Sequence, residues 1–248
     1  MSQPTRRYIT TPIYYASGDP HIGHAYTTIL ADVLARFDRL TGADVLFLTG
    51  TDEHGPKIEE EASRQSLSPI ELCNLMAERF QAAWKTLEIS HDRFIRTTEA
   101  EHKAVVTAFL ERLWERGEIY EGPYSGLYCI HEERYWTEKD LGPNHSCPDC
   151  GRPVEHLHET NYFFKMGRHF AWLAEYIEAH PDFIRPERYR NEVLAMLREE
   201  SGLGGDLCIS RPKSRLDWGI ELLSLIRISE PTRLGLGSYA VVCLVKRR

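Results

Sequence analysis

The first 116 residues alternate between short apolar runs and longer segments whose apolar residues recur with helical spacing. The runs at 8–11, 45–48 and 94–96 have the length and β-prone composition of strands. Strands that are joined through helices form parallel sheets with right-handed crossovers. The order predicts an α/β fold with a doubly wound parallel sheet, and the uninterrupted apolar run 45–48 predicts a central strand covered on both faces.

The segments between these runs carry helix signals. Apolar residues from His21 to about Gly42 recur at three- and four-residue steps, which predicts a helix with one buried stripe. The stripe consists of Ile22, Tyr26, Ile29, Val33, Phe37 and Leu40. Two later helices are predicted by capping boxes, in which Ser or Thr is followed three residues later by Glu. These boxes are Ser68 with Glu71 and Thr98 with Glu101.

The pattern changes after Gly117. Short aromatic strand-like pieces surround a loop rich in Gly, Pro, Cys and His, and helical patterns follow from about His169 to His180 and from Arg188. We interpret this region as an inserted, smaller α+β domain. The predicted division is 1–116 for the first part of a nucleotide-binding domain, 117–205 for the insertion, 206–219 for a return to the first domain, and 220–248 for a tail.

Composition narrows the class of protein. The formal net charge is -7, which argues against a general nucleic-acid binder and requires any RNA contact to be local. No apolar run has the length of a secretory signal core or a membrane span. The six cysteines are few, and three of them cluster, as in a metal knuckle of a reducing compartment. We therefore expect a cytoplasmic protein without membrane partners, and the oligomeric state stays open.

A loop rich in Pro and Gly leads into the segment His21-Ile22-Gly23-His24 at a predicted helix start. Unpaired backbone N–H groups and the helix dipole favour a phosphate there. Histidines at i and i+3 lie on one side of the first turn, so both can donate hydrogen bonds to phosphate oxygens, and Gly23 lets a flat base approach the backbone. The alternative is a pair of surface or cap histidines.

A second polar segment, 51–55, follows the predicted strand 45–48 after Thr49 and Gly50. Open α/β sheets hold their ligands at the carboxyl ends of their strands. Asp52 offers a carboxylate that can pair with an amino group, and His54 adds an imidazole. The alternative is a solvated turn in which Asp52 caps the next helix.

Several motifs in one order resemble a known family. They are 9–15 (ITTPIYY), 21–24 (HIGH), 49–55 (TGTDEHG), 94–98 (FIRTT), 126–129 (GLYC), 190–194 (RNEVL) and 209–214 (ISRPKS). Together they resemble the methionyl-tRNA synthetases, which are class I aminoacyl-tRNA synthetases, over roughly residues 7–219. The resemblance implies the first half of a class I Rossmann catalytic domain.

The resemblance also implies a reaction and its residues. Methionine is activated by ATP with Mg²⁺ to methionyl-adenylate and is then transferred to tRNA(Met), including the initiator. His21 and His24 are implied as the catalytic pair that stabilises charge on the phosphates. The implied ATP contacts are Pro12, Gly23, Glu53, His54 and Gly55, together with His21 and His24. The implied methionine contacts are Asp52 for the ammonium group, and Ile13 and Tyr15 for the side chain.

The clustered cysteines are Cys129, Cys147 and Cys150, with a two-pair spacing close to that of a structural zinc knuckle. Compared with zinc-binding members of the family, this chain has Glu132 where they have a cysteine. The expected zinc site is therefore the three cysteines plus Glu132, or His131, or His145. A metal-free loop with three reduced cysteines is the alternative.

Residues 220–248 do not match the family, and the sequence suggests an amino-terminal fragment with an unrelated tail. We expect such a fragment to be inactive alone and to leave strand edges and apolar helix faces uncovered. Two other functions stay open at this point. One is a different class I synthetase or a nucleotidyltransferase, and the other is a non-catalytic RNA-binding module built around the cysteine knuckle.

Overall fold

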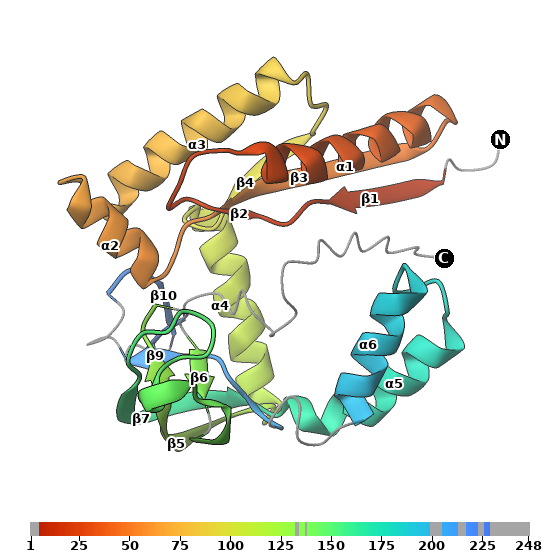
Figure 1. The fold of residues 1–248 in the computed structure, drawn as a ribbon. Coiled ribbons are helices and arrows are strands. Elements are labelled where there is room, and N and C mark those ends of the chain that lie inside the picture. The colour runs from red at the N-terminus through yellow and green to blue at the C-terminus, as the bar shows by residue number, and fades with distance from the viewer. Residues whose placement is uncertain are drawn as a thin grey trace.

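The computed structural model describes residues 5–131, 134–136, 138–198, 205–212, 217–222 and 226–228. A parallel sheet forms the first part of the chain (Figure 1). Its strands are β1 (Arg6–Thr10), β2 (Tyr14–Tyr15), β3 (Asp44–Asp52) and β4 (Arg93–Arg96).

The central strand is β3, as predicted. β1 pairs with the first half of β3 and β2 with its last two residues, while β4 pairs with the other edge, and all three pairings are parallel. β1 and β2 thus follow one edge of β3, with a break at residues 11–13. Pro12 lies in this break, where its missing N–H costs no ladder hydrogen bond.

Helices α1 (Ile22–Leu40) and α3 (Pro69–Thr86) pack against the same face of this sheet (Figure 1). Ile9 of β1 and Phe47 of β3 contact α1, and Tyr14 of β2 packs on Phe80 and Trp84 of α3. Two more helices complete this part, α2 (Pro56–Arg64) and α4 (Ala100–Glu115). The predicted parallel α/β fold is confirmed.

The predicted buried stripe of α1 is wrong. Ile22 is 84% exposed, Phe37 62% and Leu40 87%. The buried face is made of Thr28, Ala31, Asp32 and Ala35. Small side chains on that face allow the helix axis to lie close to the sheet, and spacing alone does not show which of two possible stripes packs inward.

Within the described part of the chain, the run 45–48 of β3 is fully covered on one face only, contrary to the prediction for this run. Phe47 is fully buried, whereas Leu46 on the opposite face is 50% exposed and Tyr8, its partner in register, is 42% exposed. Among the described residues, the expected exposed apolar helix face is present on α1, and Leu46 of the central strand is exposed as well.

The two capping predictions have different outcomes. Ser68 caps α3 and Glu71 bonds back to the Ser68 N–H, as predicted. At α4 the N-cap residue is Glu99, without a side-chain cap. The Thr98 hydroxyl donates to Glu53 instead, and Glu101 pairs with Arg93, so tertiary partners replace the local box.

An antiparallel sheet with strand order β6-β5-β7-β8 forms the second part of the chain, and α4 leads to it from β4 (Figure 1). The short aromatic pieces belong to two long strands, which were predicted only in part. The sheet strands are β5 (Ile119–Cys129), β6 (Arg134–Trp136), β7 (Glu155–Phe164) and β8 (Leu207–Cys208).

The predicted helices of this part are present as α5 (Phe170–Ala179) and α6 (Glu187–Arg198), which form a hairpin around Ile177, Ile184 and Leu194. The remaining elements are η1 (Glu138–Asp140), η2 (Pro143–His145), η3 (Met166–His169), β9 (Arg211–Pro212), β10 (Ile220–Leu222) and β11 (Ile226–Ile228). β8 pairs with β7 of the antiparallel sheet, although β8 lies in the segment 206–219 that was predicted to return to the first domain. Residues 223–225 and 229–248 of the tail lie outside the described residues.

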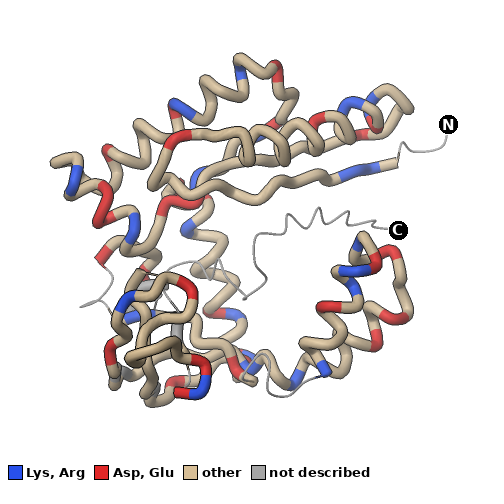
Figure 2. The backbone as a smooth tube through the Cα atoms, viewed as in Figure 1, with Lys and Arg blue, Asp and Glu red and all other residues tan. Residues whose placement is uncertain are grey.

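Charges are mixed over both parts. Figure 2 shows basic and acidic positions interspersed along the parallel and antiparallel parts of the described chain. This distribution agrees with the net charge of -7. In the described part of the chain, no helix has the length and hydropathy needed to cross a membrane.

The absence of a side chain at Gly50 allows β3 and β4 to lie close together, because a Cβ there would lie 2.0 Å from the Ile95 carbonyl oxygen. We predict that Gly50→Ala lowers the free energy of unfolding by about 1 to 3 kcal/mol, since backbone has to move. Urea denaturation measures the free energy of unfolding of the variant and of the wild-type chain. Gly18→Ala is the control, because its Cβ would have no atom within 4 Å. Equal effects of the two changes would contradict the close packing.

Candidate active site at the sheet edge and helix start

The two histidines of the HIGH segment build the start of α1. His21 is the N-cap residue, and its Nδ1 accepts a hydrogen bond from the Gly23 N–H at 3.1 Å. The Nδ1 of His24 accepts from the His21 N–H at 3.3 Å, and the two rings stack with centroids 3.6 Å apart. Because both Nδ1 atoms are acceptors, each neutral ring carries its proton on Nε2, which stays a donor.

Capping and phosphate binding are therefore compatible here. The cap alternative is correct as a description of His21, but it uses only the Nδ1 atoms. Gly23 has a further role, since a Cβ at this position would lie 3.0 Å from the His21 ring. The absence of a side chain leaves room for the cap.

Burial, and then the nearby His21, lowers the pKa of His24 from 6.5 to about 4. His24 is therefore a neutral donor at pH 7. Since the folded-state pKa lies below the ordinary value, protonation favours the unfolded chain. The contribution of His24 to stability is complete above about pH 6.5 and is lost as the pH falls towards 4.

We predict that the imidazole protons of His24 titrate with a pKa of about 4 in an NMR pH titration. In His21→Ala the pKa of His24 should rise only part of the way to 6.5, because burial is the larger cause. A wild-type pKa of 6.5, or a decrease in the variant, would contradict the stacked arrangement.

Tyr14 connects the helix start to the sheet. Its ring lies 4.6 Å from the His24 ring between centroids, and its hydroxyl is 2.7 Å from the Thr28 hydroxyl. Burial raises the pKa of Tyr14, and the hydrogen bond to Thr28 acts in the opposite direction. The position of His24 is therefore fixed by a residue of β2.

The next residue of β2, Tyr15, is paired in register with Asp52 at the end of β3. The Ala16 N–H donates to the Asp52 carbonyl oxygen at 3.0 Å. Asp52 is 2% exposed and Tyr15 41% exposed. Pro12 and Ile13 lie just before, in the link between β1 and β2. Tyr15 and Asp52 thus lie side by side at the ends of β2 and β3, and Ile13 lies directly before β2.

Glu53 differs from the other predicted ATP contacts. It is fully buried, and its carboxylate accepts from the Arg96 Nε at 2.7 Å and from the Thr51 hydroxyl at 2.6 Å. This geometry favours a positioning role over contact with ATP. His54 is also buried, and Gly55, with φ of 110°, is the N-cap residue of α2. Asp52 therefore does not cap the following helix.

A cavity of about 350 Å³ lies beside this segment. Its lining consists of His54, Lys103, Thr107, Trp218, Gly219, Ile220 and Glu221. It includes one predicted ATP contact, His54, but not His21, His24, Tyr15 or Asp52. Trp218, whose ring lies 5.8 Å from that of His54, had no predicted role. A lone tryptophan before a tail carries no motif that would reveal such a contact.

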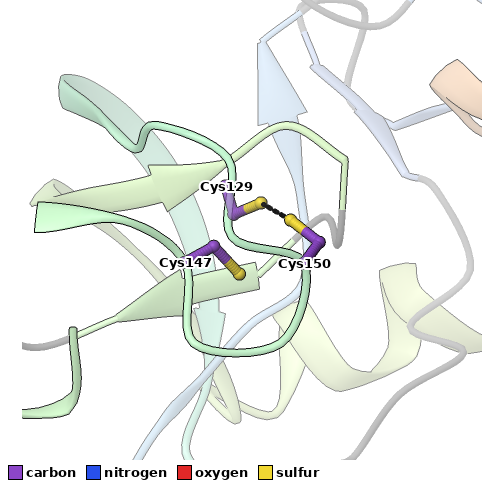
Figure 3. A group of neighbouring side chains, drawn as sticks. All are labelled: Cys129, Cys147 and Cys150. Carbon is purple, nitrogen blue, oxygen red and sulfur yellow. Dashed lines mark hydrogen bonds between the residues drawn. The ribbon is translucent and has the colours of Figure 1, made fainter. Parts of the chain in front are cut away.

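The three clustered cysteines converge at the end of β5 (Figure 3). Their sulfur atoms all lie within 4.8 Å of one another, and Cys129 Sγ is 3.5 Å from Cys150 Sγ. Burial raises the pKa of the Cys147 thiol, but the N–H groups of Cys150 and Asp149 outweigh it, so the pKa lies below its ordinary value. A reduced zinc knuckle has this construction.

The cluster fits a zinc ion. Tetrahedral zinc with Zn–S bonds of about 2.3 Å places sulfur atoms roughly 3.8 Å apart. The Gly151 N–H donates to the Cys147 carbonyl oxygen at 2.8 Å, and Gly151 has φ of 71°, which closes the turn between two ligands. Among the described residues, neither His131 nor His145 belongs to the group. Glu132, the other candidate, lies outside the described residues.

A parallel sheet with imidazoles at a helix start and a carboxylate at a strand end is typical of nucleotide-binding α/β proteins. A family model described as tRNA synthetases class I (M) matches residues 7–156, and the chain belongs to this family. Relatives named methionine–tRNA ligase are 51% identical over 215 residues in Caldanaerobacter subterraneus subspecies tengcongensis and 52% identical over 213 residues in Clostridium tetani.

These matches cover 87% and 86% of this chain, but the chain spans only about a third of the length of the two relatives, 33% and 32%. Among solved structures, a Mycobacterium tuberculosis methionyl-tRNA synthetase in complex with methionyl-adenylate is 37% identical and superposes with a TM-score of 0.82. That match covers 91% of this chain and 44% of the other. The predicted family and fold class are confirmed.

Proposed function

We propose that this chain supplies the methionine and α-phosphate contacts of a methionine–tRNA ligase. The observation that carries the proposal is the role of β2, whose residue Tyr14 contacts His24 and whose next residue, Tyr15, pairs with Asp52. One strand therefore holds two groups close together: a histidine that can donate a hydrogen bond to a phosphate, and a carboxylate that can accept one from an ammonium group. Ile13 and Tyr15 contact the methionine side chain, which offers shape and soft contacts with an aromatic ring rather than hydrogen bonds.

The chemistry follows from these contacts. A carboxylate oxygen of methionine attacks the α-phosphorus of ATP, the bond to the pyrophosphate oxygen breaks, and pyrophosphate leaves with its electron pair. The Nε2–H groups of His21 and His24 donate to phosphate oxygens as charge develops on them, which is electrostatic stabilisation. A hydroxyl at the tRNA(Met) 3′ end then attacks the adenylate carbonyl carbon, loses its proton, and AMP leaves.

The other contacts complete the proposal. Pro12, Gly23, His54 and Gly55 lie close to the adenosine part of ATP, and Mg²⁺ accompanies the phosphates.

The domain division at residues 117 and 206 is part of the proposal. The return to the first domain is completed at Trp218, whose indole N–H donates to the Glu53 carbonyl oxygen. The three cysteines hold one zinc ion, and Glu132 is the proposed fourth ligand, since His131 does not belong to the cluster. We propose a cytoplasmic location, where translation occurs.

Amino acid selectivity tests the proposal against a different class I activity. NMR amide shifts of the 248-residue chain are followed during titration with methionine, leucine, isoleucine or valine. We expect saturable shifts near Tyr15 and Asp52 with methionine only, because an aliphatic side chain lacks the thioether contact with Tyr15. Equal responses to leucine, or a response to no amino acid, would contradict the proposal.

A further inference from the structure

Glu53 directly follows the end of β3, and both its N–H and its carbonyl oxygen form hydrogen bonds. Its N–H donates to the Thr97 hydroxyl at 2.9 Å. Its carbonyl oxygen accepts from the indole N–H of Trp218 and from the Cys73 thiol, whose sulfur lies 3.5 Å away. Thr97 directly after β4, Cys73 of α3 and Trp218 before β10 therefore fix the two peptide units that flank the Glu53 Cα.

The side chain of Glu53 is fixed as firmly. Arg96 donates from Nε to Oε1 at 2.7 Å and from Nη2 to Oε2 at 3.0 Å, in a two-pronged pairing. The hydroxyls of Thr51 and Thr98 donate one bond to each carboxylate oxygen. A planar guanidinium that binds both oxygens sets the rotation of the carboxylate as well as its position.

Stability alone does not explain this pair. The Glu53 side chain is 0% exposed and that of Arg96 22% exposed, so both charges lose hydration. A buried ion pair is often no more stabilising than apolar residues of the same volume, whereas a defined geometry can be its contribution. The residue directly before Glu53 is Asp52, the last residue of β3, and its side chain points to the opposite side of the strand.

We propose that Arg96 is a positioning residue for Asp52. Its two-pronged pairing with Glu53 holds the 51–54 turn so that the Asp52 carboxylate meets the ammonium group of methionine, while Arg96 itself touches no ligand. This inference rests on the proposed methionine site. It adds a requirement for guanidinium geometry, because an ammonium on a flexible stem cannot bind both oxygens in one plane.

Arg96→Lys tests the requirement, and Arg93→Lys is the matched control. Both arginines lie in β4 and pair with glutamates, but Arg93 pairs with Glu99 and Glu101 near the surface. Methionine affinity is measured by calorimetry on the full 248-residue chain. We expect roughly 10- to 100-fold weaker binding for Arg96→Lys, as for a misplaced binding group, and no change for Arg93→Lys.

A double-mutant cycle separates positioning from general loosening. If Arg96 acts through Asp52, Arg96→Lys has no further effect on methionine affinity in the Asp52→Asn background. Independent, additive losses would overturn the proposal. If Arg96→Lys does not fold, Thr98→Val removes a single donor to the same carboxylate and is measured in the same cycle, with a smaller loss expected.

Amide hydrogen exchange tests the positioning role of Arg96 without any methionine present. In Arg96→Lys we expect faster exchange of the Glu53 N–H and of the Ala16 N–H, which is bonded to Asp52, with unchanged exchange in α1. Unchanged exchange at both amides would overturn the positioning role. If the wild-type chain binds no methionine, the proposed function fails, and the exchange result still decides whether Arg96 positions this turn.

Discussion

The purified 248-residue chain is expected to contain about one zinc ion, and its removal should unfold the antiparallel part of the molecule. Cys129 is the last residue of β5 and Cys147 lies in the stretch between β6 and β7, and each is 1% exposed, so the ion would join this stretch to the end of β5. Structural zinc contributes on the order of 10 kcal/mol in small zinc domains. A large loss of stability should therefore follow a strong chelator.

Elemental analysis and thermal melting with and without chelator measure this effect. Cys147→Ser should abolish zinc binding and reproduce the melting curve of the chelated protein. Cys208→Ser is the matched control, because Cys208 lies in β8 of the same sheet but outside the cluster. If the purified protein contained no zinc and its melting temperature did not change with chelator, the loop would be metal-free. This is the alternative that the sequence left open.

Asp52→Asn is expected to weaken methionine binding by at least roughly 30-fold. The change keeps the shape of a side chain that is 2% exposed but removes its charge. Loss of one partner of a buried charge pair costs about 2 to 5 kcal/mol, and each 1.4 kcal/mol is about tenfold in affinity. Calorimetric titration of wild-type and variant chains gives the ratio directly.

N-acetylmethionine is the ligand-side control for this prediction. It lacks the ammonium charge, so wild-type and Asp52→Asn chains should bind it equally weakly. A loss of N-acetylmethionine affinity in the variant as large as the loss for methionine would mean that Asp52 supports the fold of the pocket and does not pair with the ammonium group.

The parallel fold was predictable because each of its signals is local. Strand-like runs, the break at Pro12, the helix end near Gly42 and the Ser68 cap all depend on residues near in sequence, and the order of strands and helices then fixes the topology. The HIGH segment was predictable for the same reason, because a helix start needs only its first turn.

The errors come from contacts between distant residues. Spacing placed Ile22 and Phe37 inward, yet the helix packs through Ala31 and Ala35, because close approach to Ile9 and Phe47 requires small side chains. The capping box at Thr98 was overridden by the buried Glu53 carboxylate, a partner 45 residues away. The role of Glu53 itself was not predictable from its motif, since the motif carries no information on Arg96.

The central claim is that the start of α1 and the end of β3 hold one activated amino acid together. NMR amide shift mapping with a stable methionyl-adenylate analogue, methionine joined to adenosine through a sulfamate, tests it most directly on the full chain. We expect saturable shifts at His21–His24 and at Asp52–Gly55 with a single affinity. Shifts confined to one of these segments, or two unequal affinities, would contradict it.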